Sequence, residues 1–207
     1  MNLVILGATG GTGRLVVEQA LTAGHAVTAL VRSPEKLTIR NSSLRVIAGR
    51  ATDAGDVARA FEGADAVIST LGGTGSVIAD STRAILEGAH KTAVKRIVVL
   101  SSFFVERDRL GALSRLLTGI AAGSKIKDKI AGEQLLRQSD LDWTIVYASP
   151  LTDGPATGFV VVPGKGTKRE IWDRISRSDV AAALVQAATS PQYSRRSVGI
   201  TGGTRTN

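Results

Sequence analysis

Short apolar runs alternate with segments of helical periodicity along most of the chain. The runs predict strands at Leu3–Leu6, Ala26–Val31, Leu44–Ala48, Ala66–Ser69, Arg96–Leu100, Trp143–Tyr147, Phe159–Val162 and Ser197–Thr201. Apolar residues with helical spacing predict a helix that follows Gly13 and ends before Gly24, and further helices over residues 56–61, 77–92, 126–138 and 177–188. Strands that alternate with helices are typical of a doubly wound, mainly parallel α/β sheet.

Two stretches break this alternation. Residues 103–124 hold an apolar series interrupted by charges, which predicts an amphipathic helix: Phe103, Phe104, Leu110, Leu113, Leu116, Leu117 and Ile120. This helix either packs on the sheet or a subunit interface, or forms one wall of a substrate pocket. Residues 151–172, rich in glycine and proline, are expected to form the opposite wall. With no repeat or linker, we predict one domain over residues 1–207 with a small C-terminal part that covers the substrate. Its last helix is expected to be capped by Ser178 or Asp179.

Small and polar residues follow four of the predicted strands. They are Gly7–Gly13, Leu71-Gly72, Ser101-Ser102 and Ser149-Pro150. In open α/β sheets, ligands bind at the carboxyl ends of the strands, so we expect the site there.

The first of these loops has the spacing Gly7-x-x-Gly10-x-x-Gly13 between a strand and a helix. Such a turn directs backbone N–H groups and the positive end of the helix towards one point, which suits a phosphate. A glycine triplet can also be a plain turn, but between strand and helix it predicts dinucleotide binding.

The residues at the end of the second strand indicate which dinucleotide the protein binds. NAD-specific sites usually carry an acidic residue here for the ribose 2′-hydroxyl, whereas this chain has Arg32, followed by Lys36. A guanidinium forms paired hydrogen bonds with phosphate, which favours the 2′-phosphate of NADP(H). The alternative is that Arg32 is a solvated charge and Glu35 contacts the ribose.

Composition limits the other classes of function. The formal net charge is +8, but the basic residues are scattered, and two Trp, two Tyr and four Phe offer few rings for stacking bases. We therefore expect a small-molecule substrate and no nucleic acid. The chain has no cysteine, and His25 and His90 lack partners at metal-ligand spacing, so no metal is expected. No export signal or bilayer-length apolar run is present, which predicts a cytoplasmic protein without membrane contact. We expect a monomer or a homodimer.

Six motifs in order carry a resemblance to a known family: Gly7-Ala-Thr-Gly-Gly-Thr-Gly13, Ala29-Leu-Val-Arg32, Asp65-Ala-Val-Ile68, Ile97-Val-Val-Leu-Ser-Ser102, Leu141-Asp-Trp-Thr-Ile-Val146 and Ser176-Arg-Ser-Asp-Val-Ala181. Together they resemble the atypical short-chain dehydrogenase/reductases with an NAD(P)H-binding domain, in particular the NmrA-like and biliverdin reductase B (flavin reductase) branches. The resemblance spans nearly the whole chain and is weakest at residues 103–124 and 151–172. It implies a Rossmann-type sheet, NADP(H), and hydride transfer to a conjugated acceptor.

The resemblance also implies roles for individual residues. Phosphate contacts fall on Gly7, Thr9, Gly10, Thr12 and Gly13, and 2′-phosphate contacts on Arg32 and Lys36. Thr70, Leu71 and Gly72 line the ribose and nicotinamide, and Ser101 orients the nicotinamide; Pro150 follows the sixth strand beside the cofactor. Where the family often has Gly-Asp near adenine, this chain has Gly49-Arg50, so Arg50 is expected to stack on the ring or add to the phosphate field.

The catalytic centre departs from the family. Typical members use Tyr-x-x-x-Lys, in which the lysine holds the ribose and lowers the tyrosine pKa for proton exchange. The matching register here is Lys125-x-x-x-Lys129, with Glu133 one turn later. Lys129 is expected to touch the ribose, or else to form a solvated helix pair with Glu133. Tyr147 is a candidate proton donor, or a core tyrosine.

Three functions follow from these residues. The first is an NADPH-dependent reductase of a flavin- or quinone-like molecule, in which proximity governs hydride transfer and Ser101, Lys129 and Tyr147 are the catalytic candidates. The second is a sensor that binds NADP(H) without turnover, which the missing tyrosine favours. The third is an epimerase or dehydratase acting on a sugar nucleotide or polyketide, which needs an acid–base pair that the sequence does not offer.

Overall fold

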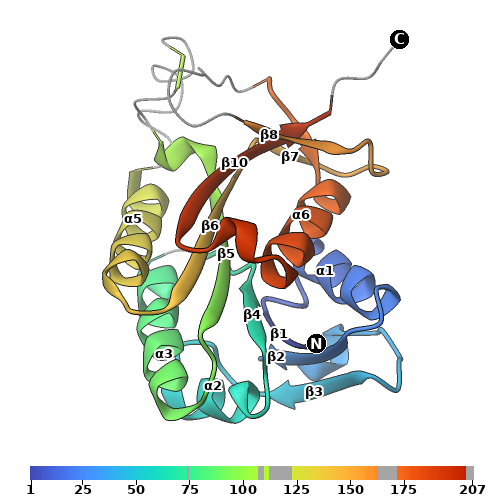
Figure 1. The fold of residues 1–207 in the computed structure, drawn as a ribbon, viewed down its shortest axis with the longest axis vertical. Helices are drawn as coiled ribbons and strands as arrows, with labels where there is room; N and C mark the ends of the chain where they lie inside the picture. Colours follow the sequence, from blue (N-terminus) through green and yellow to red (C-terminus); the bar gives the residue numbers. More distant parts are fainter. Residues whose placement is uncertain (74, 107–109, 112–122, 163–171, 204–207) are drawn as a thin grey trace.

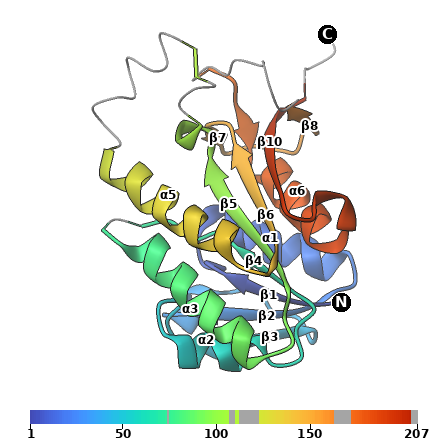
Figure 2. The ribbon, with the colours of Figure 1, turned by 60° about the vertical axis from the view of Figure 1, so that its left-hand side comes forward.

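An eight-stranded sheet in the order β3-β2-β1-β4-β5-β6-β10-β8 organises the protein (Figures 1 and 2). The computed structural model describes residues 1–73, 75–106, 110–111, 123–162 and 172–203. The strands are β1 (Asn2–Leu6), β2 (Ala26–Val31), β3 (Leu44–Ala48), β4 (Ala66–Ser69), β5 (Arg96–Ser102), β6 (Asp142–Ala148), β8 (Phe159–Val162) and β10 (Arg196–Gly202). All neighbours pair in parallel except β8, which runs antiparallel to β10 at the edge. The predicted doubly wound, mainly parallel sheet is confirmed.

Helices cover both faces of the sheet (Figure 1). In the described part of the chain these are α1 (Gly11–Thr22), α2 (Ala54–Phe61), α3 (Val77–Lys91), α5 (Gly123–Gln138) and α6 (Arg177–Thr189). Helices α1 and α6 lie side by side on one face, and α2, α3 and α5 cover the other (Figure 2). Short 3₁₀ helices follow at Pro34–Lys36, Phe103–Val105 and Pro191–Tyr193.

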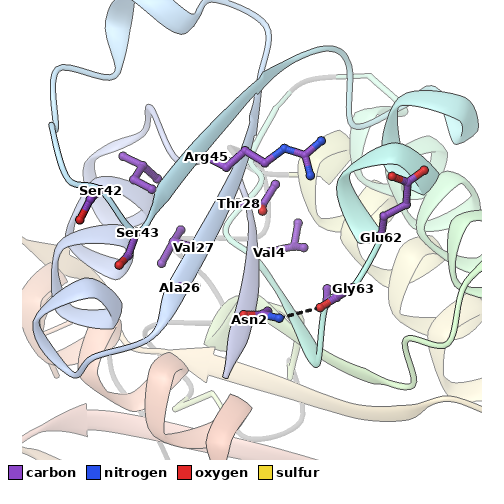
Figure 3. A pocket seen from close by; sticks show the side chains of 12 residues that line it. Asn2, Val4, Ala26, Val27, Thr28, Ser42, Ser43, Arg45, Glu62 and Gly63 are labelled. Carbon is purple, nitrogen blue, oxygen red and sulfur yellow. Dashed lines mark hydrogen bonds between the residues drawn. The ribbon is translucent and has the colours of Figure 1, made fainter.

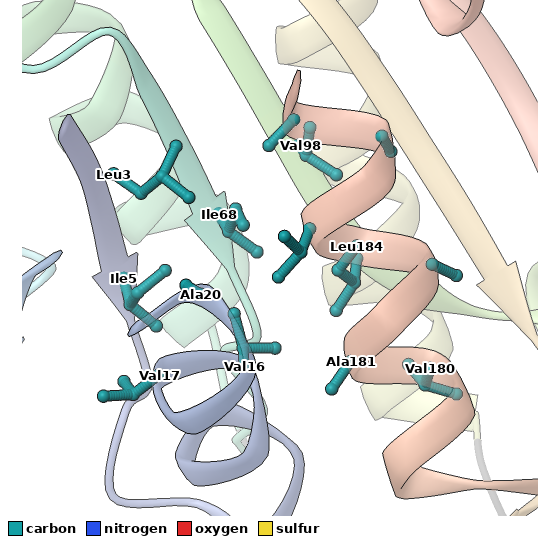
Figure 4. Packing of buried hydrophobic residues seen from close by; sticks show 14 of the residues in the cluster. Leu3, Ile5, Val16, Val17, Ala20, Ile68, Val98, Val180, Ala181 and Leu184 are labelled. Carbon is teal, nitrogen blue, oxygen red and sulfur yellow. The ribbon is translucent and has the colours of Figure 1, made fainter. Parts of the chain in front are cut away.

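Strand β1 shows how the sequence divides the core between the two faces. Successive side chains of a strand point to opposite faces, so Leu3 and Ile5 pack with α1 and α6, whereas Val4 and Leu6 pack with α2 and α3. Figure 4 shows Leu3 and Ile5 opposite Val16 of α1 and Leu184 of α6. Each such buried aliphatic side chain contributes about 1.5–3 kcal/mol to folding. Burial on both faces explains why central strands such as β1 and β4 are continuous apolar runs.

The chain reverses direction across the sheet between β1 and β4. From β1 it proceeds outward to β2 and β3, and then returns to β4 and continues to β5 and β6. The loops after β1 and β4 therefore leave the sheet towards opposite faces and open a crevice between them, where doubly wound proteins bind ligands.

The predicted start of α6 at residue 177 matches the structure, but the predicted cap, Ser178 or Asp179, is wrong. The helix begins at Arg177, and its cap is Ser176, whose Oγ accepts a hydrogen bond from the Asp179 amide at 3.0 Å. Asp179 is the third helical residue, and its carboxylate accepts from the Ser176 hydroxyl at 2.8 Å, which fixes the capping side chain. The same carboxylate accepts from the amides of Thr157 and Gly158, and so fixes the loop that leads into β8.

The two irregular stretches lie partly outside the described residues. In the first, Phe103–Val105 is a 3₁₀ turn, Phe103 and Leu110 are buried, and 107–109 and 112–122 are not described. In the second, β7 (Leu151–Thr152) pairs with β9 (Ile175–Ser176), β8 forms as predicted, and 163–171 are not described. Their roles as pocket walls remain predictions.

Candidate functional site

The glycine-rich loop leaves the first turn of α1 open to an anion. Gly10 occupies the N-cap position, so no side chain caps the first amides of the helix. The Gly10 amide donates to the Gly7 carbonyl at 3.0 Å, which closes a tight turn directly after β1. Uncapped amides at a helix N-terminus, together with the helix dipole, form a site for a phosphate group.

Gly7 and Gly13 are required by geometry. Gly7 has φ = +88°, a conformation that L side chains rarely adopt. A Cβ on Gly13 would lie 2.1 Å from the Gly7 carbonyl oxygen and 2.7 Å from Thr70 Oγ1. Thr70 follows β4 and donates from Oγ1 to the Leu6 carbonyl at 3.1 Å, which fixes the crevice between the two loops. The glycines therefore let α1 approach β1 closely. We call the loop Gly7–Gly13, with the open first turn of α1, the glycine cradle.

A cleft of about 550 Å³ opens from this cradle along the carboxyl ends of β1 to β4. Its volume lies within the usual range of small-molecule sites. Eight of the predicted cofactor residues line it: Gly7, Thr9, Gly10, Arg32, Arg50, Thr70, Leu71 and Gly72. Arg32 and Arg50 are both exposed, and neither guanidinium has a hydrogen bond or ion pair to another described residue.

The other predicted cofactor residues lie outside this cleft. Thr12 and Gly13 are buried in the first turn of α1, behind the cradle. Lys36 lies in the 3₁₀ turn after β2, with its side chain exposed and its carbonyl accepting from Arg14 at 3.2 Å. Pro150 follows β6, and Ser101 and Lys129 line a separate small cavity.

Ser81 is a cleft residue that the sequence did not single out. It lies on α3, is 2 % exposed, and lines the cleft with Val77 of the same helix. Among the described residues its Oγ has no hydrogen-bond partner, although nearly all buried polar atoms have one. A polar group of a bound ligand would supply the missing partner. Together with the glycine cradle and the two unpaired guanidiniums, this hydroxyl fits an anionic dinucleotide.

A second group of polar side chains lies at the ends of β5 and β6. Ser101 and Tyr147 are neighbours in the parallel pairing of these strands and point to the same face, towards α5. Ser101 Oγ donates to Glu133 Oε1 of α5 at 2.6 Å, and the Tyr147 hydroxyl donates to Glu133 Oε2. Glu133 is 7 % exposed, so the alternative of a solvated pair with Lys129 is wrong for this carboxylate.

The electrostatics of this cluster follow from burial. Burial raises the pKa of Glu133 against the opposing effect of its hydrogen bonds and of Arg137 and Lys129. Burial and the Glu133 carboxylate raise the pKa of the Tyr147 phenol. Burial also lowers the pKa of Lys129, whose ammonium has no hydrogen bond to another described residue. The side chain of Lys125 lies outside the described part of the chain.

Helix α5 is held in place by neighbours on three elements. Asp128 accepts hydrogen bonds from the amides of Ile78 and Ala79, at 2.9 and 3.0 Å, and so caps α3 from a neighbouring helix. Arg137 donates to the Tyr147 hydroxyl at 3.0 Å and to Ser197 Oγ of β10 at 2.7 Å. Sequence reasoning missed Asp128 and Arg137, since their partners are distant along the chain.

A second hollow of about 340 Å³ lies at the amino ends of β1 to β3 (Figure 3). Asn2 on its floor donates from Nδ2 to the Gly63 carbonyl at 2.9 Å, and none of the predicted site residues lines it. Ligands of parallel sheets bind at the opposite ends, so the cleft beside Gly10 is the candidate site.

The described residues contain no group of three or more His, Cys, Asp or Glu side chains that could hold a metal ion. Within the same ranges, no helix combines the length and the apolar character that a bilayer crossing requires.

The reversing sheet, the glycine cradle and the cleft at the carboxyl ends define a dinucleotide-binding protein of the Rossmann type. The family model described as NAD(P)H-binding matches residues 7–191. The chain belongs to this family.

Relatives and solved structures are similar to this chain over nearly all of its length. An uncharacterised chloroplastic protein of Arabidopsis thaliana is 30 % identical over 96 % of this chain and 76 % of its own. A (4-alkanoyl-5-oxo-2,5-dihydrofuran-3-yl)methyl phosphate reductase of Streptomyces griseus is 26 % identical over 97 % of this chain and 67 % of its own. The structure of an anaerobillin reductase of Escherichia coli superimposes with a TM-score of 0.83 at 24 % identity, covering 100 % of both chains. A Veillonella parvula short-chain dehydrogenase/reductase in complex with NADP superimposes with a TM-score of 0.79 at 22 % identity, over 99 % of this chain and 95 % of its own.

Proposed function

We propose that this protein is an NADPH-dependent reductase of a conjugated small molecule of the flavin or quinone type. The observation that carries the proposal is the cleft itself, which joins an uncapped helix N-terminus to two unpaired guanidiniums. Such a cleft suits a ligand with a pyrophosphate in its middle and a further phosphate at one end.

The preference for NADPH rests on Arg32 and Arg50. Both line the cleft at the carboxyl ends of β2 and β3, on the side where the adenosine ribose of a dinucleotide lies. Two planar guanidiniums can hold the oxygens of a 2′-phosphate between them. Lys36, the second cation proposed from the sequence, does not line the cleft. Glu35, the alternative ribose partner, is exposed in the same 3₁₀ turn. We therefore assign the second phosphate contact to Arg50.

The nicotinamide half of the cofactor would extend from the cradle across β4 towards β5 and β6. Ser101 and Lys129 lie there and are the proposed contacts of the nicotinamide and its ribose. Bound NADPH supplies the hydride. A conjugated acceptor suits this site because its delocalised system spreads the charge that hydride addition leaves, so that proximity accounts for most of the rate. Tyr147 has its phenol committed to Glu133, which weakens it as a direct proton donor.

Names of relatives support reduction and do not fix the substrate. One relative is the phosphate reductase of Streptomyces griseus, and another is named an isoflavone reductase homolog of Arabidopsis thaliana. The second candidate function, a sensor that binds NADP(H) without turnover, is favoured by Lys125 in the position of the usual tyrosine.

Turnover separates the two functions. The purified protein is mixed with NADPH and a panel of acceptors that includes FMN and a naphthoquinone, and the loss of NADPH absorbance is followed. A reductase accelerates NADPH oxidation with at least one conjugated acceptor and does so less with NADH. Tight NADPH binding without acceleration by any acceptor contradicts the reductase and supports the sensor.

A further inference from the structure

The buried carboxyl group of Glu133 accepts hydrogen bonds from two hydroxyl groups, one on β5 and one on β6. Ser101 Oγ lies 2.6 Å from Oε1, and the Tyr147 hydroxyl contacts Oε2. We propose that Glu133 stores the proton of the reduction and passes it to the acceptor through Ser101, in place of the tyrosine that the family normally uses. This inference rests on the proposed reductase function and names the proton source for that site.

Position favours Ser101 as the group that meets the acceptor. The cleft occupies the carboxyl ends of β1 to β4, so the reactive half of a bound dinucleotide must lie towards β5 and β6. Ser101 is the penultimate residue of β5, and with Lys129 and Glu133 it lines a small cavity there. Glu133 lies behind Ser101 and acts through it as a positioning residue.

Burial makes the carboxyl group of Glu133 easier to protonate than an exposed one. Glu133 is 7 % exposed, and burial raises its pKa. The charged groups that oppose this rise are Arg137, with its Nη2 3.9 Å from Oε2, and Lys129. Burial lowers the pKa of Lys129. This disfavours the charged ammonium form of Lys129, which is the form that would stabilise ionised Glu133.

Tyr147 is a poor donor to the acceptor and positions the carboxyl group instead. Its hydroxyl donates to Glu133 and accepts from Arg137, and burial raises its pKa. Arg137 also donates to Ser197, which is exposed on β10. A guanidinium does not give up a proton in proteins, so these contacts hold Glu133 in place and do not carry protons to it.

The step balances without another reactant. The acceptor gains a hydride, with its two electrons, from the C4–H bond of the reduced nicotinamide. When Glu133 is protonated, its carboxyl proton points to Ser101 Oγ and the Ser101 hydroxyl turns from Glu133 to the acceptor. The negative charge left on the acceptor takes the proton of Ser101 Oγ, as the carboxyl proton of Glu133 moves to that oxygen. The products are the reduced acceptor, the oxidised nicotinamide and ionised Glu133, which regains a proton from solvent by way of Ser101 once the product has left.

The test is the pH profile of acceptor reduction at saturating NADPH, for the wild type and for Glu133→Gln. Because Glu133 must be protonated, kcat of the wild type falls as the pH rises through the pKa of this group. Glutamine keeps the shape but has no proton to give, so kcat falls ~100-fold, the profile flattens, and the dissociation constant of NADPH stays the same. Glu87→Gln, on the exposed side of α3, makes the same charge change and retains the wild-type profile.

Two further variants keep the proposal falsifiable if Gln disturbs packing. Ser101→Ala should reproduce the loss of kcat, whereas Glu133→Asp should recover part of the rate and of the pH dependence. A wild-type rate and profile in either Glu133→Gln or Ser101→Ala overturns the relay but leaves the reductase standing. Absence of turnover in the wild type removes the reductase, and the relay with it.

Discussion

At the scale of single residues, a hydroxyl at the C-cap of α3 and one within the helix show how a side chain can be recognised as a ligand contact. Thr92 Oγ1 at the C-cap donates to the Gly88 carbonyl at 3.1 Å, as hydroxyls on helices commonly do. Ser81 Oγ within the helix is buried beside the cleft and has no partner in the part of the chain that the structure describes. A buried hydroxyl without a partner costs folding free energy, so its presence suggests that a ligand satisfies it.

Substitution of Ser81 by Ala should therefore act in opposite directions on the free protein and the complex. We expect the melting temperature of the free protein to stay the same or rise, because no hydrogen bond is lost. The affinity for NADPH should fall by about 2- to 10-fold, the equivalent of one hydrogen bond. Calorimetric titration and thermal unfolding measure the two effects. Thr92→Val is the matched control, which should lower stability and leave affinity unchanged. A Ser81→Ala protein that is less stable and binds NADPH normally contradicts the assignment.

The sequence suggested which residues would lie together where a residue type has few physical uses, such as close backbone approach or phosphate binding. Gly7, Gly10 and Arg32 line one cleft, and their contacts with a cofactor stay a prediction. Glu133 was considered only as a partner of Lys129. Its contacts with Ser101 and Tyr147 depend on the register of β5 against β6, which no local pattern reveals.

At the scale of elements, a side chain of α5 caps the N-terminus of α3. The Asp128 carboxylate accepts from two amides in the first turn of α3, where a helix N-terminus favours negative charge. Asp128 is 7 % exposed and immediately precedes Lys129, so this contact also fixes the part of α5 that faces the site. The orientation of Lys129 and Glu133 therefore depends on it.

Removal of this carboxylate should destabilise the protein and loosen α5. Asp128→Ala leaves two amides of α3 without a partner, which we expect to lower the free energy of unfolding by about 1–3 kcal/mol in urea denaturation. Asp128→Asn keeps one acceptor oxygen and should cost less. Asp80→Ala, which removes an exposed ion pair with Arg83 on the same helix, should cost only about 0–1 kcal/mol. Equal losses for Asp80→Ala and Asp128→Ala would show that the interhelical cap has no special role.

Elements were predicted well where burial is continuous and less well at their ends. The strands appear as apolar runs because both faces of the sheet are covered. The cap of α6 was misassigned because Ser176, Ser178 and Asp179 are all good caps, and the choice depends on where β9 ends. The wall segments 103–124 and 151–172 lack such a pattern, and their roles are still predictions.

At the scale of the whole molecule, the sheet order and the loops combine into one anionic-ligand site. The order reversal beside β1, the uncapped α1 and the guanidiniums at the ends of β2 and β3 come from separate parts of the chain. The fold class and the family were predictable because these parts have recognisable sequences. The acceptor, the oligomeric state and the cytoplasmic location have no such signature and stay predictions.

The most direct test of this account is a calorimetric comparison of NADPH and NADH binding to the wild type and to Arg32→Ala. We expect the wild type to bind NADPH about 10- to 100-fold more tightly, since charge-assisted hydrogen bonds to the 2′-phosphate are worth about 1.5–3 kcal/mol. Arg32→Ala should remove most of this preference while NADH binding changes little. Arg45→Ala, which removes an exposed charge beside the opposite hollow, serves as the control. Equal affinity of the wild type for the two nucleotides, or no binding of either, would contradict the account.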